Sequence, residues 1–366
     1  MKRTLGLTLL LFATLFSCMR QEKPLPAELS RAESVMWEHP DSALSILRSM
    51  PQSSLSIGKN YATWALLLAQ ARDKVYGKRL PDSLNIPSSD KLVQDAMDYF
   101  EKEGDLKRMA QTYYYKGQLL KDQKKITEAM PFFLKSKEMM TKLDEPLFTY
   151  LICQSLGNMY RYQDLYEESL VQLKDAYQYA LRSGNGERIS YALSELGRTY
   201  VHKNEMDSAL FYFGKSLDNA QRLGNIELEA MAMGELGVVY NKLSQGEKAL
   251  HYTRKELDLC LQISSLHKLP QVYYKIGSAF WSLGQLDSAK VYFQKSLETD
   301  NLYTLNEAYE VLYYICVEQK LYKEAIEYNN QYLIYSDSLQ VINHAGELAE
   351  IQARYDHERL LNINNQ

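Results

Sequence analysis

The chain is poor in residues that break helices and in residues that cross-link small domains. Its 366 residues include only 9 prolines, 17 glycines and 4 cysteines. Such low proline and glycine contents argue against a turn-rich all-β protein. Cys153, Cys260 and Cys316 are spread along the chain, which is the spacing of neither a disulfide framework nor a metal site. We expect these three cysteines to be buried thiols.

An excess of positive charge is also absent. The chain has 42 basic and 46 acidic residues, for a formal net charge of −4. A protein that binds nucleic acid by neutralising phosphates needs a basic surface, so we expect no nucleic acid partner. The length exceeds the ~250–300 residues at which a single core stops growing, so the sequence predicts either two domains or a repeat array.

Long apolar runs are missing except at the N-terminus. Met1-Lys2-Arg3 is basic, and residues 5–16 are apolar but too short to span ~30 Å of hydrocarbon. This pattern predicts a secretion signal over residues 1–17. Leu15-Phe16-Ser17-Cys18 also resembles the lipobox of bacterial lipoproteins, which implies cleavage before Cys18, lipidation of that residue and a linker over 18–26. A plain signal peptide with an incidental cysteine is the alternative.

These features predict where the mature protein resides. We expect it in the bacterial cell envelope, outside the cytoplasm and attached to the membrane through its lipid only, on the periplasmic side or at the surface.

A 40-residue repeat occupies the middle of the chain. Glycines recur at this spacing, and small residues follow each of them by 12 positions. The glycines are Gly117, Gly157, Gly197, Gly237 and Gly277, and the small residues are Ala129, Ser169, Ala209, Ala249 and Ala289. A second series, Gly104, Asp144, Gly184, Gly224 and Ser264, falls where a helix would end in the left-handed conformation.

Each 40-residue unit reads as two amphipathic helices. Apolar residues recur at helical spacing, as in Leu193, Leu196 and Tyr200. A glycine inside a helix costs ~1 kcal/mol, so the repeated glycines need a packing reason. We predict that the two helices of a unit cross closely where the glycine and the small residue lie.

The sequence Leu196-Gly197, followed by Tyr200, Ala209, Phe213 and Ser216, resembles the tetratricopeptide repeat. The resemblance implies an all-α fold, a right-handed superhelical solenoid of antiparallel helix pairs. It extends over residues 27–336, with clear repeats at 107–300, degenerate repeats at both ends and a loop insertion at 77–89.

A long amphipathic helix is predicted for residues 337–366. Leu339, Ile342, Leu348, Ile351 and Tyr355 would form its apolar stripe. The segment either caps the solenoid or pairs with another helix. Residues 349–356 also resemble the connector that follows sensor repeats in many Bacteroidetes-type regulators. In that interpretation the C-terminal helix contacts a membrane regulator that supplies the output domain.

No arrangement of residues predicts catalysis. The sequence contains no nucleophile–base pair at a known spacing, its six histidines lack ligand spacing, and no phosphate-binding loop is complete. We therefore expect no enzymatic activity, no catalytic residues, no cofactor and no metal.

The resemblance implies instead a protein or peptide partner on the concave face, which the first helix of each unit lines. In the family that the chain resembles, with the glycine counted as the eighth residue of a repeat, the side chains at positions two, five, nine, twelve and thirteen face the concave surface. The candidate binding residues are Tyr114, Lys121, Asn158, Arg161, Tyr162, Tyr191, Arg198, His202, Asn241, Lys242, Tyr274 and Trp281.

Four of these candidates, Lys121, Arg161, Arg198 and Lys242, would form a basic line. Arginine offers two parallel hydrogen bonds to a carboxylate, so this line predicts an extended anionic peptide or a peptide C-terminus as the ligand. We also expect reversal of Arg161 and Arg198 to glutamate to leave stability nearly unchanged. The sequence thus predicts a non-catalytic, lipid-anchored binding scaffold. The alternative is the ligand-sensing component of a membrane signalling system, without an output domain of its own.

Overall fold

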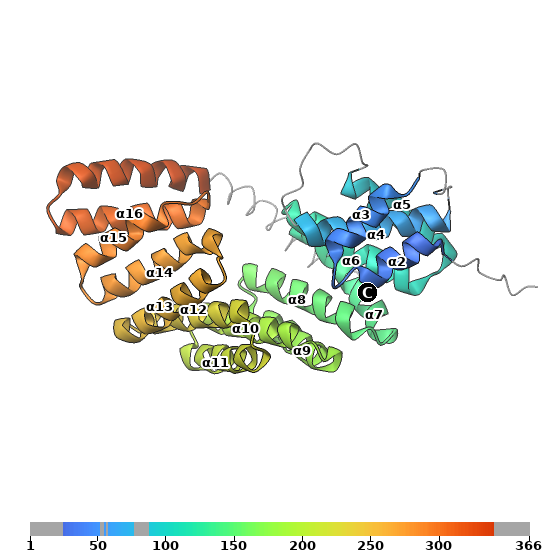
Figure 1. Cartoon of the computed structure of the whole chain (residues 1–366), viewed down its shortest axis with the longest axis horizontal. Coiled ribbons are helices and arrows are strands. Elements are labelled where there is room, and N and C mark those ends of the chain that lie inside the picture. Colours follow the sequence, from blue (N-terminus) through green and yellow to red (C-terminus); the bar gives the residue numbers. More distant parts are fainter. Residues whose placement is uncertain (1–24, 52–54, 56–57, 77–87, 340–366) are drawn as a thin grey trace, which may run out of the picture. The chain divides into compact units, whose positions relative to one another are not determined.

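A computed structural model of the chain describes residues 25–51, 55, 58–76 and 88–339. Every regular element in these residues is a helix (Figure 1). The predicted signal peptide, Cys18, most of the predicted linker, the insertion at 77–87 and the segment 340–366 lie outside the described residues. None of the described helices is both long enough and apolar enough to cross a membrane.

The chain divides into two compact units, Met1–Arg108 and Met109–Gln366. The first unit contains α2 (Ala27–Val35), α3 (Pro40–Ser49), α4 (Lys59–Tyr76) and α5 (Ser89–Glu103). Successive helices of this unit contact one another, and α2 also contacts α4. The Trp64 indole donates a hydrogen bond of 2.9 Å to the Leu47 carbonyl, and the Tyr61 hydroxyl donates one of 2.7 Å to Asp95. These bonds join α4 to both of its neighbours.

The division between the units falls within α6 (Leu106–Asp122). The remaining helices all belong to the second unit. They are α7 (Ile126–Lys142), α8 (Pro146–Tyr162), α9 (Tyr166–Ser183), α10 (Gly186–His202), α11 (Met206–Leu223), α12 (Ile226–Lys242), α13 (Gly246–Gln262), the 3-10 turn η2 (Leu266–Lys268), α14 (Leu269–Ser282), α15 (Leu286–Ser296) and α16 (Leu302–Glu318). A further helix begins at residue 322 and is still continuous at 339, so it runs through position 337.

The second unit is a stack of helix pairs. The pairs α8–α9, α10–α11, α12–α13 and α14–α15 make the most extensive contacts, and each first helix also contacts the first helix of the next pair. Figure 1 shows the pairs following one another from green to red. This arrangement confirms the prediction of an all-α, tetratricopeptide-like solenoid.

The repeated glycines allow the close helix crossing that the sequence predicts. A Cβ atom on Gly197 would lie 2.6 Å from the Phe213 ring, and one on Gly157 would lie 2.6 Å from Leu173. The small residues beside these crossings, such as Ala209, are fully buried. The second helix of a pair therefore packs so close to the first that the repeated glycine has no room for a Cβ atom.

The turns between helices also follow the repeat. All five residues of the predicted helix-stop series have positive φ angles, from 54° at Ser264 to 74° at Gly104. A second set with positive φ, which the sequence analysis did not identify, lies between the two helices of each pair. Its members are Lys124, Asp164, Asn204, Ser244, Gly284 and Lys320. Most of them are not glycine, so their left-handed conformation leaves a weaker sequence signal.

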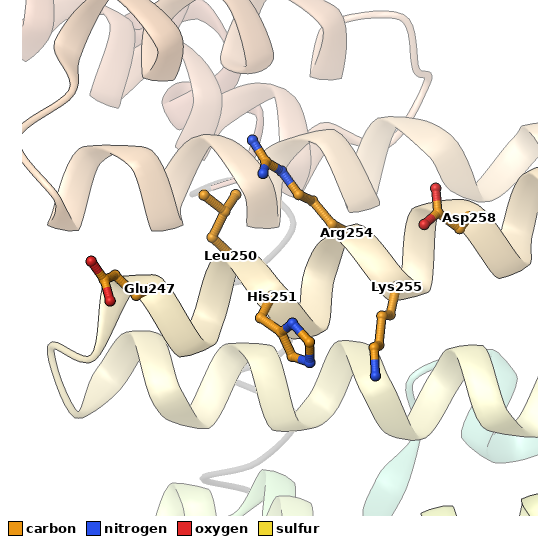
Figure 2. Close-up of a pocket in the computed structure, with 6 residues that line it drawn as sticks. All are labelled: Glu247, Leu250, His251, Arg254, Lys255 and Asp258. Atoms are coloured by element: carbon orange, nitrogen blue, oxygen red, sulfur yellow. The ribbon is translucent and has the colours of Figure 1, made fainter.

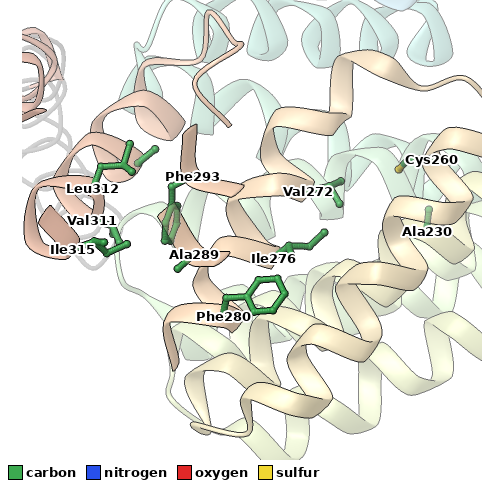
Figure 3. Packing of buried hydrophobic residues seen from close by; sticks show 11 residues of the cluster. Ala230, Cys260, Val272, Ile276, Phe280, Ala289, Phe293, Val311, Leu312 and Ile315 are labelled. Atoms are coloured by element: carbon green, nitrogen blue, oxygen red, sulfur yellow. The ribbon is translucent and has the colours of Figure 1, made fainter. Parts of the chain in front are cut away.

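The many tyrosines are largely explained by packing within the pairs. Tyr200 stacks on Tyr212 with ring centroids 5.3 Å apart, and Tyr240 stacks on Tyr252 at 5.2 Å. Stacked rings at this separation contribute beyond the area that they bury. At the C-terminal end of the unit, Figure 3 shows Phe293, Ile276 and Leu312 in one core cluster that joins α14, α15 and α16.

Candidate functional site

The first helices of the pairs provide the face on which the sequence places a binding site. We call the side formed by α8, α10, α12, α14 and α16 the first-helix face. Adjacent members of this set are in contact, so residues at equivalent repeat positions come close to one another.

Charged side chains of α8, α10 and α12 form a continuous series of ion pairs on this face. Arg161 on α8 donates to Glu195 on α10 through Nη1 and Oε2, 2.7 Å apart. Arg198 binds the other oxygen of Glu195 at 2.7 Å and reaches Glu235 on α12 at 2.6 Å. We call these four residues the ion ladder. Burial alone would lower the pKa of Arg198, but the two carboxylates raise it above its ordinary value.

The ion ladder corrects the prediction of an exposed basic line. The Arg161 side chain is 7% exposed and that of its partner Glu195 is 9% exposed. Arg161 and Arg198 are thus neutralised by acids of the neighbouring helices, and neither is available as an isolated cation for an anionic ligand. The same pairing argues against the expectation that both arginines could be reversed without loss of stability, because glutamates there would face Glu195 and Glu235.

The acidic partners occupy a repeat position that the sequence analysis did not consider. Glu195 and Glu235 each lie two residues before the repeated glycine, and Lys275 on α14 occupies the equivalent place. A search of that position at the 40-residue spacing would have found these charges. The prediction omitted them because it took the outward positions from the family resemblance alone.

A buried carboxylate lies beside the ion ladder. Glu256 on α13 has a side chain that is 8% exposed, and its Oε1 accepts a bond of 2.7 Å from Lys275 Nζ. Its Oε2 is buried without a hydrogen-bond partner. Burial raises the pKa of Glu256, the charge of Lys275 opposes this shift and that of Glu235 adds to it.

Acidic groups continue onto α16. Tyr274 on α14 shares a side-chain hydrogen bond with Glu307, and the nearby Glu310 also acts on the tyrosine. Burial and these two carboxylates raise the pKa of Tyr274. On α12, α14 and α16 the acids Glu235, Glu307 and Glu310 thus outnumber the base Lys275 among the groups described so far.

The remaining predicted binding residues fall into different environments. Tyr114 is buried among Tyr115, Phe133 and Phe148, so its assignment as a ligand contact is corrected to a core position. Among the predicted aromatic contacts, Tyr162, at 76%, Tyr191 and Trp281 are exposed, and Tyr274 is half-buried.

The polar candidates are also varied. His202 stacks on Tyr166, with ring centroids 6.3 Å apart, and partial desolvation of its ring together with the Arg161 charge lowers its pKa. Lys242 is exposed, whereas Lys121 is half-buried and donates to Gln118 at 2.5 Å. Asn158 and Asn241 each have a buried Oδ1 without a hydrogen-bond partner.

A hollow on α13 offers no comparable arrangement. Figure 2 shows the residues that line it, all from this one helix: Glu247, Leu250, His251, Arg254, Lys255 and Asp258. In the part of the chain that the structure describes, no three His, Cys, Asp or Glu side chains are placed to hold a metal ion.

Comparison with known proteins identifies the repeat. The tetratricopeptide-repeat family pattern matches residues 110–139 and 270–301. These two segments match the tetratricopeptide repeat, and the arrangement of helix pairs between them is tetratricopeptide-like. The comparison with curated proteins found no match to the sequence.

Several solved structures share the fold at low sequence identity. A signal transduction ATPase with a tetratricopeptide repeat sensor from Pyrococcus horikoshii aligns with a TM-score of 0.65 at 15% identity, covering 88% of this chain and 48% of that one. Aspartyl phosphate phosphatase F from Bacillus subtilis has a TM-score of 0.53 at 15% identity, covering 91% and 96%. A Rap protein complexed with Competence and Sporulation Factor has a TM-score of 0.59 at 12% identity, covering 86% and 98%.

These alignments also compare the lengths of the proteins. This chain spans about half of the length of the ATPase and nearly the whole length of the other two proteins. At such identities the likeness shows the fold alone.

Proposed function

We propose that this protein is a non-catalytic scaffold that binds an extended peptide segment of a protein partner along the first-helix face. The observation that carries the proposal is the exposure of Tyr162, Tyr191 and Trp281 on α8, α10 and α14, three of the helices that form the first-helix face. Exposed aromatic side chains supply a large contact area at low entropic cost, and they are enriched where proteins bind partners. The ion ladder joins α8 and α10, which present Tyr162 and Tyr191, to α12.

The chemistry of this face favours a partner with polar and apolar groups over a strongly anionic one. Arg161 and Arg198 are already paired with Glu195 and Glu235, and further acids lie on α13 and α16. An anionic peptide would have to compete with these intramolecular carboxylates for the same guanidinium groups. The proposed ligand is therefore a peptide that contacts the aromatic side chains and does not depend on a basic groove.

The test is selection from a random 12-residue peptide library displayed on phage. We expect enrichment on the wild-type protein and loss of the enriched peptides on a variant carrying Tyr162→Ala, Tyr191→Ala and Trp281→Ala. Phe211→Ala is the matched control, because Phe211 is also an exposed aromatic residue but lies on the second helix α11. No enrichment, or equal retention by the triple variant, would refute binding at these residues.

The proposed location is the bacterial envelope, with a lipid on Cys18 as the attachment. Its support is the sequence: a basic start, an apolar stretch and Leu15-Phe16-Ser17-Cys18. Expression with an alkyne-labelled fatty acid should label the wild-type protein and leave the Cys18→Ala variant unlabelled. Labelling of both proteins would place any lipid elsewhere, and labelling of neither would leave a plain signal peptide.

Ligand sensing is the second candidate function. It is favoured by the fold shared with an ATPase whose repeats are described as a sensor and with a Rap protein solved with Competence and Sporulation Factor. In this version the protein resembles the sensor half of Bacteroidetes-type regulators and acts on a membrane partner through residues 337–366. Deletion of residues 340–366 should then abolish capture of that partner and leave selected peptides bound. If the protein is a scaffold without signalling, the deletion should change neither the set of captured membrane proteins nor the binding of the selected peptides.

A further inference from the structure

The repeat continues onto α16, but at a spacing of 36 residues instead of 40. Among the turn residues with positive φ, Lys320 follows Gly284 by 36 positions. Two tilted ring pairs, with centroids 6.1 Å and 6.2 Å apart, have the same offset: Tyr273–Tyr292 and Tyr309–Tyr328. The fully buried Ile276 on α14 likewise corresponds to the fully buried Leu312 on α16. This offset identifies the residues of α16 that lie on the first-helix face.

In this register, positions two, five, nine, twelve and thirteen of α16 form an open row of side chains. We call the row the α16 row, and its residues are Glu307, Glu310, Tyr314, Val317 and Glu318. Residues three or four positions apart are neighbours on the surface of a helix. Tyr314 is 50% exposed and Val317 is 40% exposed, Glu307 and Glu318 are exposed, and Glu310 is half-buried. A strict 40-residue spacing misses this row.

The acids of the α16 row lack counter-ions. The helix contains no lysine, arginine or histidine. The acids of the ion ladder are paired with arginines. Within the described residues, by contrast, no acid of the α16 row takes part in an ion pair. An exposed tyrosine and an exposed valine thus lie among carboxylates whose charges the chain does not neutralise.

Tyr314 lies at the centre of this arrangement. Glu310 precedes it by one helical turn and Glu318 follows it by one turn, which places their Cβ atoms roughly 5–6 Å from that of the tyrosine. Its ring rests against the Tyr313 ring, with centroids 5.1 Å apart. A cation over an aromatic face is attracted by the ring quadrupole, and a guanidinium can also donate to a neighbouring carboxylate. Arginine combines both properties in one planar group.

We propose that the α16 row binds an arginine side chain of the partner peptide, with its guanidinium over the Tyr314 ring between Glu310 and Glu318. This inference rests on the proposed function and specifies the chemistry of one ligand residue. The aliphatic stem of the arginine packs on the exposed Val317, and its charged head stays in contact with water and the carboxylates. The negative charge of α16 attracts a basic segment and repels an acidic one.

Charge also favours a separate partner over the remainder of this chain as the occupant. Residues 340–366 contain the acids Glu347, Glu350, Asp356 and Glu358 and the arginines Arg354 and Arg359. Because acids outnumber arginines there, this segment complements α16 poorly. A second copy of the chain is acidic overall, with a formal net charge of −4. A basic peptide of a different protein is the better match.

The experiment uses the peptides selected on the wild-type protein as probes. We expect the enriched peptides to share an arginine. Its replacement by citrulline, which keeps the length and the planar group but has no charge, should weaken binding about fivefold. The expected effect is moderate because exposed cation–π contacts and exposed ion pairs each contribute modestly. Affinities are measured by fluorescence anisotropy on the full-length protein.

Matched variants separate this site from general attraction to an acidic protein. On a variant with Tyr314→Leu, Glu310→Gln and Glu318→Gln, the arginine and citrulline peptides should bind with equal affinity. Tyr314→Phe keeps the ring and should keep the difference. The control carries Tyr322→Leu and Glu327→Gln, the same kinds of change at exposed positions of the helix that begins at residue 322, and it should also keep the fivefold difference. Circular dichroism verifies that each variant is folded.

The possible contrary outcomes are distinct. Selected peptides without a shared arginine would leave peptide binding in place and refute the arginine site. An arginine preference that persists in the triple variant would place the cation elsewhere. Tighter peptide binding after deletion of residues 340–366 would identify that segment as the occupant of the α16 row and contradict the inference. A library that yields no peptide would instead refute the proposed function, and the arginine site with it.

Discussion

The carboxylate of Glu256 occupies the space that a side chain at position 234 would fill. A Cβ atom on Gly234 would lie 2.4 Å from Glu256 Oε1. One repeat earlier, the same two positions hold Ser194 and Ser216, whose hydroxyl oxygens are 3.0 Å apart. A small pair in one repeat is thus replaced by a glycine and a long acid in the next.

This relationship predicts a compensating pair of substitutions. Gly234→Ser alone should lower the free energy of unfolding by ~1–3 kcal/mol, because the added atoms collide with the buried carboxylate. Combining it with Glu256→Ser should restore most of the loss, since the two positions then match Ser194 and Ser216. Urea unfolding followed by circular dichroism measures both. Equal stability of the single and double variants would contradict the proposed packing.

The repeated glycines predict a graded response to alanine. A Cβ at Gly197 would lie 2.6 Å from the Phe213 ring, whereas one at Gly277 would lie 3.1 Å from Phe293. Gly197→Ala should therefore lower the urea midpoint more than Gly277→Ala, with a loss of ~1–3 kcal/mol.

Gly214 provides the control for this series. It lies inside α11 with nothing near its missing Cβ, so Gly214→Ala should raise stability by ~0.5–1 kcal/mol through helix propensity. A uniform effect at Gly197, Gly277 and Gly214 would show that helix propensity, and not the crossing distance, decides the outcome.

The features that the sequence predicted correctly are those with local or steric causes. Gly197 has to be glycine because Phe213 lies against it, and Gly184 and Gly224 end helices with positive φ angles. Each requirement acts on one position and repeats every 40 residues, so a single sequence shows the period.

The ion ladder was not predictable in the same way. Whether Arg161 points to solvent or to Glu195 depends on the rotation between successive helix pairs, which the period does not specify. Tyr114 failed for a related reason: rings from two other helices, Phe133 and Phe148, surround it. Pairing of long charged or aromatic side chains depends on tertiary geometry, so the outward positions of a repeat do not determine it.

The ion ladder predicts a large difference between buried and exposed ion pairs. Glu195→Gln leaves the Arg161 guanidinium buried without a charged partner and should cost ~3–5 kcal/mol of stability. Glu138→Gln breaks the exposed pair with Lys142 and should change stability little, because solvent and salt screen such pairs. Thermal unfolding of the two variants under identical conditions is the measurement, and similar losses would mean that the ladder does not stabilise the stack of first helices.

The raised pKa of Glu256 predicts a pH dependence with a definite sign. Burial favours the protonated acid in the folded state, so the folded pKa lies above the ordinary value of 4.5. The contribution of this group to stability is fully present below 4.5 and is lost as pH rises through the folded pKa. The stability of the wild-type protein relative to Glu256→Gln should therefore decrease as pH is raised from about 3.5 to about 8.

Glu138 supplies a control of opposite sign. Its hydrogen bond from Lys142 lowers its pKa, so its contribution is present above the unfolded pKa and is lost as pH falls. The stability of the wild-type protein relative to Glu138→Gln should increase slightly over the same pH range. Urea midpoints measured at each pH compare the three proteins. If the stability of the wild-type protein relative to Glu256→Gln rises with pH instead, the attraction of Lys275 outweighs burial at Glu256.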